Sequence, residues 1–209
     1  MMRIDSISPN ADRSGRFLVK CGGETMRLYR QTIEDFRLYP GLELSDEQAE
    51  RLRESAGAMS AKMRAVRIVS ATSVSRKDLE QRLVRKGENP EQAKEAVEWM
   101  EELNLVDDRQ TAQNIVRQCV YKGYGPARAR QALYEKQIPK QLWDEVLEDY
   151  PDQTEFILKF LRTKLTDPSD ERQKRRAIDA LMRRGHSYGA IRRGLDVVRA
   201  EFDEFQEEE

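Results

Sequence analysis

The sequence predicts a mainly α-helical protein in which three-helix units repeat in tandem as an elongated array, preceded by a small β-rich module. Three observations predict this fold class. Apolar side chains recur at helical spacing from about residue 60 to residue 205, and proline and glycine stand mostly at boundaries. One short pattern occurs three times, at intervals of 50 and 48 residues. The first 58 residues instead contain short alternating runs that are typical of strands.

Residues 1–58 predict three short strands followed by a helix. Gly22-Gly23 separates the last two strands and predicts a hairpin turn rather than a phosphate-binding loop. Ser45 followed by Gln48 is the signal of a capping box, so a helix is expected from about 46 to 56. So small a module can hardly bury a core alone, and we expect it to pack on its neighbour. The strands are expected at 3–7, 16–21 and 25–30.

The remaining residues predict nine helices, three in each unit. The units are placed at 59–106, 107–150 and 151–209, and the last of them ends in an acidic tail. The helices are expected at 60–72, 75–86, 90–104, 108–122, 126–136, 139–149, 152–165, 170–184 and 187–205.

The repeat is carried by three segments that align without gaps: Leu83–Gly87, Leu133–Gln137 and Leu181–Gly185. Each segment ends the middle helix of a unit with an apolar anchor, a basic residue and a turn, and another amphipathic helix follows. Three helices with one apolar stripe each can close a small core. Neighbouring units of such an array share an interface, so the sequence predicts an elongated molecule.

The composition argues against several classes of protein. Charged residues make up 36% of the chain, but the formal net charge is only -1, which excludes a uniformly basic nucleic-acid coat. No stretch of about 18 apolar residues predicts a membrane span. The first ten residues lack the pattern of a signal peptide. We therefore expect a cytoplasmic protein whose two cysteines, Cys21 and Cys119, are reduced.

Few residues of the chain could carry chemistry. His186 is the only histidine, so metal sites built on several histidines and relays with a second histidine are excluded. Cys119 lies among apolar helical positions and is expected to be a small buried residue rather than a nucleophile. Asp107-Asp108 lacks the spaced oxygen ligands of a calcium loop and is expected at a helix N-terminus. The sequence thus predicts a protein that is not an enzyme and holds no metal or cofactor.

Charge is segregated along the helical region. Residues 109–140 contain seven cations and one anion, residues 170–199 nine cations and four anions, and residues 91–108 one cation and seven anions. Any one cluster could be an ordinary solvated helix face. Two basic stretches in corresponding parts of a repeat array favour a surface that follows a phosphate backbone or an acidic filament. The candidate binding residues are Arg76, Arg82, Arg85, Lys86, Arg117, Lys122, Arg128, Arg130, Lys136, Arg175, Arg176, Arg183, Arg184, Arg192 and Arg193.

Three segments together resemble the RecX family of recombinase regulators. They are Arg67–Gly87, Leu103–Asp108 with the following Ala112, and Gly123–Leu133, and the similarity spans about residues 60–200. Some members of the family also carry a strand-rich N-terminal extension. The chain departs from the family pattern at three positions. Thr111 and His186 stand where the family usually has an aromatic residue, and Gln137 stands where it usually has a glycine.

The resemblance implies a protein that binds the RecA–DNA nucleoprotein filament and modulates it, usually by inhibiting ATP hydrolysis, strand exchange and co-protease action. It implies RecA and DNA as partners, with DNA contacted mainly through its backbone. We expect a monomer that does not bind membranes. One alternative is a transcription factor that binds duplex DNA through a helix-turn-helix, with Arg128 and Arg130 on phosphates. A nuclease using Asp107-Asp108 lacks a second cluster of metal ligands.

Overall fold

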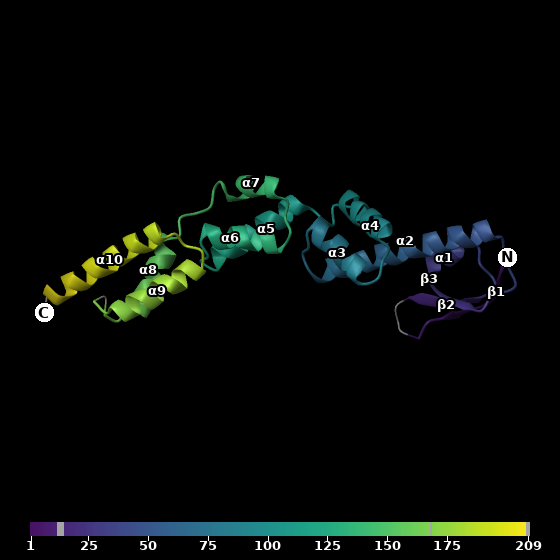
Figure 1. Cartoon of the computed structure of the whole chain (residues 1–209), viewed down its shortest axis with the longest axis horizontal. Coiled ribbons are helices and arrows are strands. Elements are labelled where there is room, and N and C mark those ends of the chain that lie inside the picture. The colour runs from purple at the N-terminus through teal and green to yellow at the C-terminus, as the bar shows by residue number, and fades with distance from the viewer. Residues whose placement is uncertain (12–14, 168, 208–209) are drawn as a thin grey trace. The chain divides into compact units, whose positions relative to one another are not determined.

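A computed structural model describes residues 1–11, 15–167 and 169–207 of the chain. The chain divides into two compact units, Met1–Asp107 and Asp108–Glu209 (Figure 1). The first unit holds a small sheet, one short helix and three longer ones, and the regular secondary structure in the described part of the second unit is all helical. The prediction of a mainly helical protein with three-helix repeats and a strand module at the N-terminus is confirmed.

Four antiparallel strands open the first unit, in the order β3-β2-β1-β4. The predicted hairpin is present, because Cys21 pairs with Glu24 across a turn in which Gly22 and Gly23 have φ values of +54° and +86°. Only glycine adopts two consecutive positive φ angles at little cost. The fourth strand has only two residues, too few to leave a pattern in the sequence. The strands are β1 (Met2–Pro9), β2 (Arg16–Cys21), β3 (Glu24–Tyr29) and β4 (Glu43–Leu44).

A short helix, α1 (Arg30–Asp35), follows the hairpin, and α2 (Asp46–Ala71) then runs for 26 residues. The predicted capping box is present at its start: Gln48 N donates to Ser45 Oγ, and Ser45 N donates to Gln48 Oε1. The prediction of two separate helices, at 46–56 and 60–72, is wrong. The predicted boundary between residues 58 and 59 therefore falls inside one continuous helix.

Two features of α2 explain why its sequence suggested a break. Its first half buries Leu52 against the sheet, and its second half buries Ala61 in the first repeat. Leu52 and Ala61 are about two and a half turns apart, so the apolar stripe changes to the opposite side of the helix. Gly57, between them, lies where α4 crosses α2: a Cβ there would lie 2.3 Å from Gln92 Oε1, the end of a flexible side chain from α4. The glycine marks a helix crossing rather than a helix end.

The first repeat consists of the second half of α2 together with α3 (Arg76–Arg85) and α4 (Pro90–Glu102). Ser75 caps α3 and Asn89 caps α4, each by accepting hydrogen bonds from backbone N–H groups of the first turn. Leu79, Leu83 and Met100 are fully buried in the core that the three helices share.

The second unit contains the other two repeats. Helices α5 (Asp108–Tyr121), α6 (Pro126–Glu135), a 3₁₀ turn η1 (Lys140–Leu142) and α7 (Trp143–Leu147) make the second repeat. Helices α8 (Thr154–Lys164), α9 (Glu171–Arg183) and α10 (Tyr188–Glu207) make the third. Leu133 is fully buried in the core of the second repeat, and Leu181 is fully buried in the core of the third.

The predicted helix at 139–149 is shorter than expected and begins as a 3₁₀ turn. Pro139 stands before it, and Trp143 donates from its indole nitrogen to Ile138 O at 3.0 Å, which fixes the first turn. Pro151 disfavours helical backbone at Tyr150, so the chain leaves the helix early. Tyr150 then donates its hydroxyl to Tyr124 O at 2.6 Å.

The repeated segments end in one turn geometry. The residue after the turn donates its N–H to the leucine carbonyl: Glu88 to Leu83 at 3.1 Å, Ile138 to Leu133 at 3.0 Å, and His186 to Leu181 at 3.2 Å. The preceding residue has a positive φ, +90° at Gly87, +54° at Gln137 and +85° at Gly185. This is the hydrogen-bond pattern of a Schellman motif, which favours glycine at the positive φ.

Gln137 is the exception among the three turns, and replacing it with glycine is expected to stabilise the second unit by about 1 kcal/mol. A side chain in the left-handed region crowds the backbone, and glycine relieves that cost there. The free energy of unfolding, measured by urea denaturation, gives the check. Gln113→Gly, at an exposed position inside α5, serves as the control and is expected to destabilise by about 1 kcal/mol, since it places glycine in a helix interior.

Candidate binding surface on the helical repeats

The residues that could carry chemistry do not assemble into a reactive site in the described part of the chain. Cys21 and Cys119 are both free thiols in buried positions, and burial raises the pKa of each. Cys119 packs in the core of the second repeat, as predicted. The described residues contain no group of three or more His, Cys, Asp or Glu side chains that could hold a metal ion. Among the described helices, none combines the length and the apolar character needed to cross a membrane.

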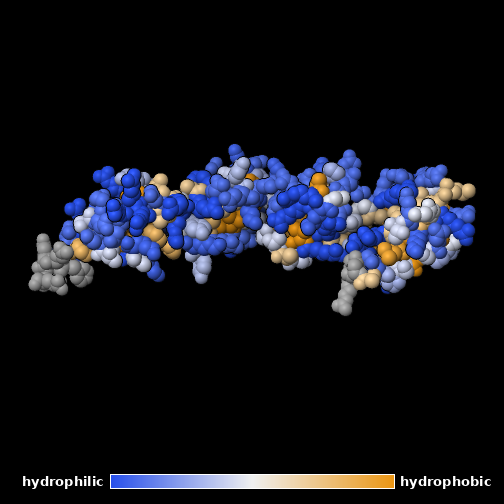
Figure 2. Space-filling view, turned by 60° about the horizontal axis from the view of Figure 1, so that its bottom comes forward, coloured by the Kyte–Doolittle hydropathy of each residue, from blue (hydrophilic) through white to orange (hydrophobic). Residues whose placement is uncertain are grey.

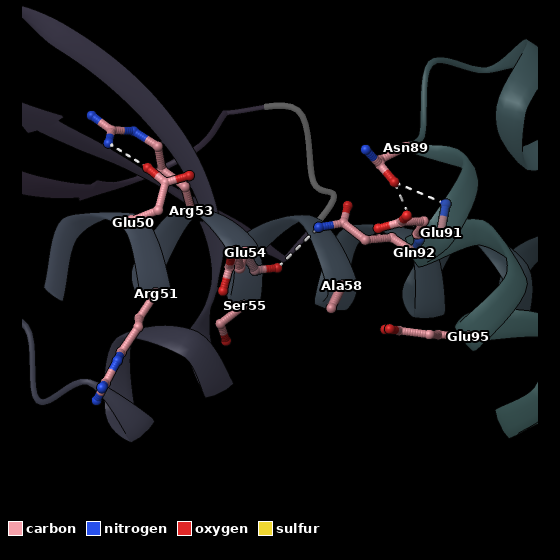
Figure 3. A pocket seen from close by; sticks show the side chains of 10 residues that line it. All are labelled: Glu50, Arg51, Arg53, Glu54, Ser55, Ala58, Asn89, Glu91, Gln92 and Glu95. Carbon is pink, nitrogen blue, oxygen red and sulfur yellow. Dashed lines mark hydrogen bonds and ion pairs between the residues drawn. The ribbon is translucent and has the colours of Figure 1, made fainter. Parts of the chain in front are cut away.

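A shallow hollow of about 730 Å³ lies in the first unit between α2 and the start of α4 (Figure 3). Its lining is polar. Arg53 pairs with Glu50 at 3.3 Å, Asn89 accepts from Glu91 N at 2.9 Å, and Gln92 donates to Glu54 O at 3.2 Å. The contact of Asn89 caps α4 and the contact of Gln92 holds α4 against α2, whereas the Arg53–Glu50 pair lies within α2, so two of the lining residues have structural roles.

The candidate arginines of the first repeat are paired with carboxylates of that repeat. Arg76 lies 3.1 Å from Glu101, and Arg82 lies 2.9 Å from the buried Asp78. Arg85 also approaches Asp78, at 4.0 Å. Each of these cations is already partly neutralised before any partner arrives, which lowers its attraction for phosphate.

Two candidate arginines of the second unit are likewise engaged. Arg128 lies 2.9 Å from Glu135, and this hydrogen bond holds the pKa of Glu135 below its ordinary value. Arg184 stacks over the ring of Phe160, 5.0 Å from its centroid. A third, Arg117, donates to Asn114 Oδ1. This acceptor is neutral, so the hydrogen bond does not neutralise the charge of Arg117.

Most of the other candidates are exposed cations that form no ion pair within the part of the chain that the structure describes. On α9, Arg176 and Arg183 are about two helical turns apart and therefore lie on the same side of the helix. Figure 2 shows hydrophilic side chains over most of its face, with small hydrophobic patches between them. The unpaired candidates are Lys86, Lys122, Arg130, Arg175, Arg176, Arg183, Arg192 and Arg193.

The second and third repeats are joined by close backbone contacts that the sequence did not predict. Gly125 N donates to Arg184 O at 2.8 Å, and Ala127 N donates to Gly185 O at 3.3 Å. A Cβ on Gly125 would lie 2.1 Å from Gly185 O, and a Cβ on Gly185 would lie 2.2 Å from Arg128 N. The two glycines thus bring the start of α6 into contact with the turn after α9. We call these contacts the repeat joint.

His186 belongs to the repeat joint. Its side chain is buried, and its Nε2 lies 3.0 Å from Gly123 O. Since a carbonyl oxygen can only accept, Nε2 carries the proton in this hydrogen bond. Burial lowers the pKa of the imidazole, although the bond to Gly123 opposes this, so the ring is neutral in the joint at neutral pH. His186 therefore has a structural role between the two repeats.

Comparison with known proteins gives consistent results. Residues 107–147 match a family model described as the second three-helix domain of RecX. The regulatory protein RecX of Halorhodospira halophila is 31% identical over 142 residues, which cover 66% of this chain and 88% of that protein. The RecX of Chlorobaculum tepidum is 33% identical over 140 residues, covering 66% and 87%.

Solved structures agree on the fold. A crystal structure of regulatory protein RecX superposes with a TM-score of 0.65 at 21% identity, over 94% of this chain and 100% of that one. The crystal structure of RecX from Lactobacillus salivarius superposes with a TM-score of 0.58 at 21% identity, over 71% of this chain and 98% of that one. The chain belongs to the RecX family of regulatory proteins.

Proposed function

We propose that this protein is a non-catalytic regulator that binds the RecA–DNA nucleoprotein filament in the cytoplasm and inhibits its ATPase, strand exchange and co-protease activities. Membership of a family of regulatory proteins supports a regulatory role. The observation that carries the proposal is the set of exposed arginines on the repeats of the second unit that form no ion pair with any residue the structure describes. Arginine pairs bidentately with both phosphate and carboxylate, the groups that a nucleoprotein filament presents.

The physical route to inhibition follows from tandem repeats. A chain of rigid three-helix units that binds several filament subunits at once opposes any motion that changes their spacing during ATP turnover. A protein bound along the DNA also blocks access of a second DNA strand. Neither route requires a reactive group on this chain, because both need only a surface that binds, and the proposed surface consists of arginine side chains.

Charge reversal on α9 tests the proposal. Arg176→Glu with Arg183→Glu is expected to weaken binding to RecA filaments on single-stranded DNA at least tenfold, about 1.4 kcal/mol. Both side chains are exposed and unpaired in the described part of the chain, so the fold should tolerate the change. Fluorescence anisotropy of labelled filaments measures the affinity, and ATP hydrolysis by the filament measures inhibition.

The matched control is Arg3→Glu with Arg27→Glu on β1 and β3, which makes the same change in net charge at two exposed arginines that form no ion pair in the described part of the chain. It is expected to leave filament affinity within about twofold of wild type. An equal loss in both variants would mean that only net charge matters, and the assigned surface would be wrong. If the wild-type protein bound naked duplex sequence-selectively and left the ATPase unchanged, the helix-turn-helix alternative would replace the proposal.

A further inference from the structure

The repeat joint borders an open pocket of about 530 Å³ in the second unit, a size typical of ligand sites. Residues from α6, from the segment between α7 and α8, from α8 and α9, and from the start of α10 surround it. Its walls are mainly apolar, and they include Pro126, Pro151, Ile157, Met182 and Ala190. Met182 is 47% exposed, which is high for an apolar side chain in a helix. The pocket therefore offers apolar surface that no part of the described chain covers.

The polar groups of the pocket are mostly engaged within the protein. Asp152 accepts from Thr154 N and Oγ1, at 3.2 and 2.9 Å, at the start of α8. His186 is neutral and bonded to Gly123 O. Arg130 differs from them, because it is exposed and forms no ion pair with the residues that the structure describes. An occupant of this pocket would thus meet apolar walls and one unneutralised cation.

We propose that this pocket receives an apolar side chain that stands beside a carboxylate on the surface of the recombinase protein itself, rather than DNA. The inference rests on the proposed function and names the partner of this part of the surface. An apolar anchor in a pocket, next to a charge pair at its rim, is the usual arrangement of a binding hot spot. Arg130 provides the charge that is complementary to a carboxylate.

Nucleic acid fits the pocket less well. A phosphate has no apolar surface to bury there, and a base requires an exposed aromatic ring on which to stack. Two aromatic rings are among the lining residues: Tyr150 is half-buried and donates its hydroxyl to Tyr124 O, and His186 is buried and bonded to Gly123 O. The unpaired arginines of α9 suit phosphate, whereas the pocket suits a protein side chain.

Two variants test the pocket, and neither removes a hydrogen-bonding group of the repeat joint, since Ala127 contributes only its backbone N–H. Ala127→Phe fills it from an exposed position in the first turn of α6, and Arg130→Met removes the charge but keeps the aliphatic stem. We expect Ala127→Phe to weaken binding at least tenfold, both to RecA filaments on single-stranded DNA and to RecA without DNA. Arg130→Met is expected to weaken binding about fivefold in the same two assays. Binding to single-stranded DNA alone should stay within about twofold for both variants.

The control is Ala200→Phe, an exposed alanine in the same unit but about ten residues along α10 from Ala190 of the pocket. It is expected to bind like wild type, and thermal melts establish that each variant is folded. If Ala127→Phe and Arg130→Met lost equal affinity for naked DNA, the pocket would be assigned to nucleic acid. If both variants kept their affinity for filaments, the pocket would not be used. Either result overturns the inference. Failure of the wild-type protein to bind filaments would instead overturn the proposed function.

Discussion

Replacing Gly125 with alanine is expected to destabilise the second unit by about 3 kcal/mol, near the upper end of the cost of overpacking. The new Cβ would lie 2.1 Å from Gly185 O and 2.6 Å from His186 N. These are backbone atoms, so no side-chain rotation can relieve the contact. Gly125 has a φ of -80°, which alanine adopts freely, so the loss would come from the clash and not from backbone strain.

Gly189→Ala provides the matched control, because it makes the same change in a helix of the same unit. The nearest atom to a Cβ at Gly189 is Arg193 Nη1, at 3.8 Å, which is ordinary contact. This variant is expected to be neutral or to gain up to about 1 kcal/mol, since Gly189 lies in the first turn of α10 and alanine lowers the conformational entropy of the unfolded chain. Urea denaturation, monitored by circular dichroism, measures the free energy of unfolding of both variants. Equal stability of the two variants would show that the repeat joint does not hold α6 against the turn after α9.

Elements whose signals are local could be predicted from the sequence. The hairpin at Gly22-Gly23, the capping box at Ser45 and the three leucine anchors each depend on residues within a few positions of one another. Their physical causes, positive φ, a side-chain cap and an apolar stripe, act over that same short range. The structure confirms each of them.

Features that depend on distant segments could not be predicted in this way. Gly57 lies inside the single helix α2, which the sequence predicted as two helices, and the end of the Gln92 side chain from α4 lies where its Cβ would stand. Gly125 stands at a helix boundary, as the sequence predicted for most glycines, but its contact with Gly185, 60 positions later, has no local signature. Glycine permits both a turn and a close approach, and only the fold distinguishes them.

The candidate site shows the same division. The clusters of basic residues are evident in the sequence, but the structure divides them into residues that pair with carboxylates and residues that do not. Arg76 meets Glu101 only because α3 and α4 pack together, whereas Arg176 and Arg183 meet no carboxylate in the described part of the chain. Binding by these residues stays a prediction, and the charge-reversal experiment on α9 is its test.

Replacing each leucine anchor with alanine is expected to cost about 3–5 kcal/mol, as for other fully buried leucines. Leu83, Leu133 and Leu181 all have an exposed fraction of 0% and stand at the same place in their repeats. Each truncation removes buried methyl groups and leaves a cavity among three helices, which can close only in part. Denaturation by urea measures each loss. Met182→Ala is the control beside Leu181. Removing this half-exposed side chain should destabilise the unit by less than about 1 kcal/mol.

The two anchors of the second unit also test whether the repeat joint transmits stability. Leu133 lies in the core of the second repeat and Leu181 in that of the third, with no shared core residue. Tandem repeats that share an interface unfold together when the interface is strong compared with the repeats themselves. Hydrogen exchange in Leu181→Ala should therefore quicken in α6 as well as in α9. If exchange quickened in the third repeat alone, the hydrogen bonds from Gly125 and Ala127 would hold the repeats in place without coupling their unfolding.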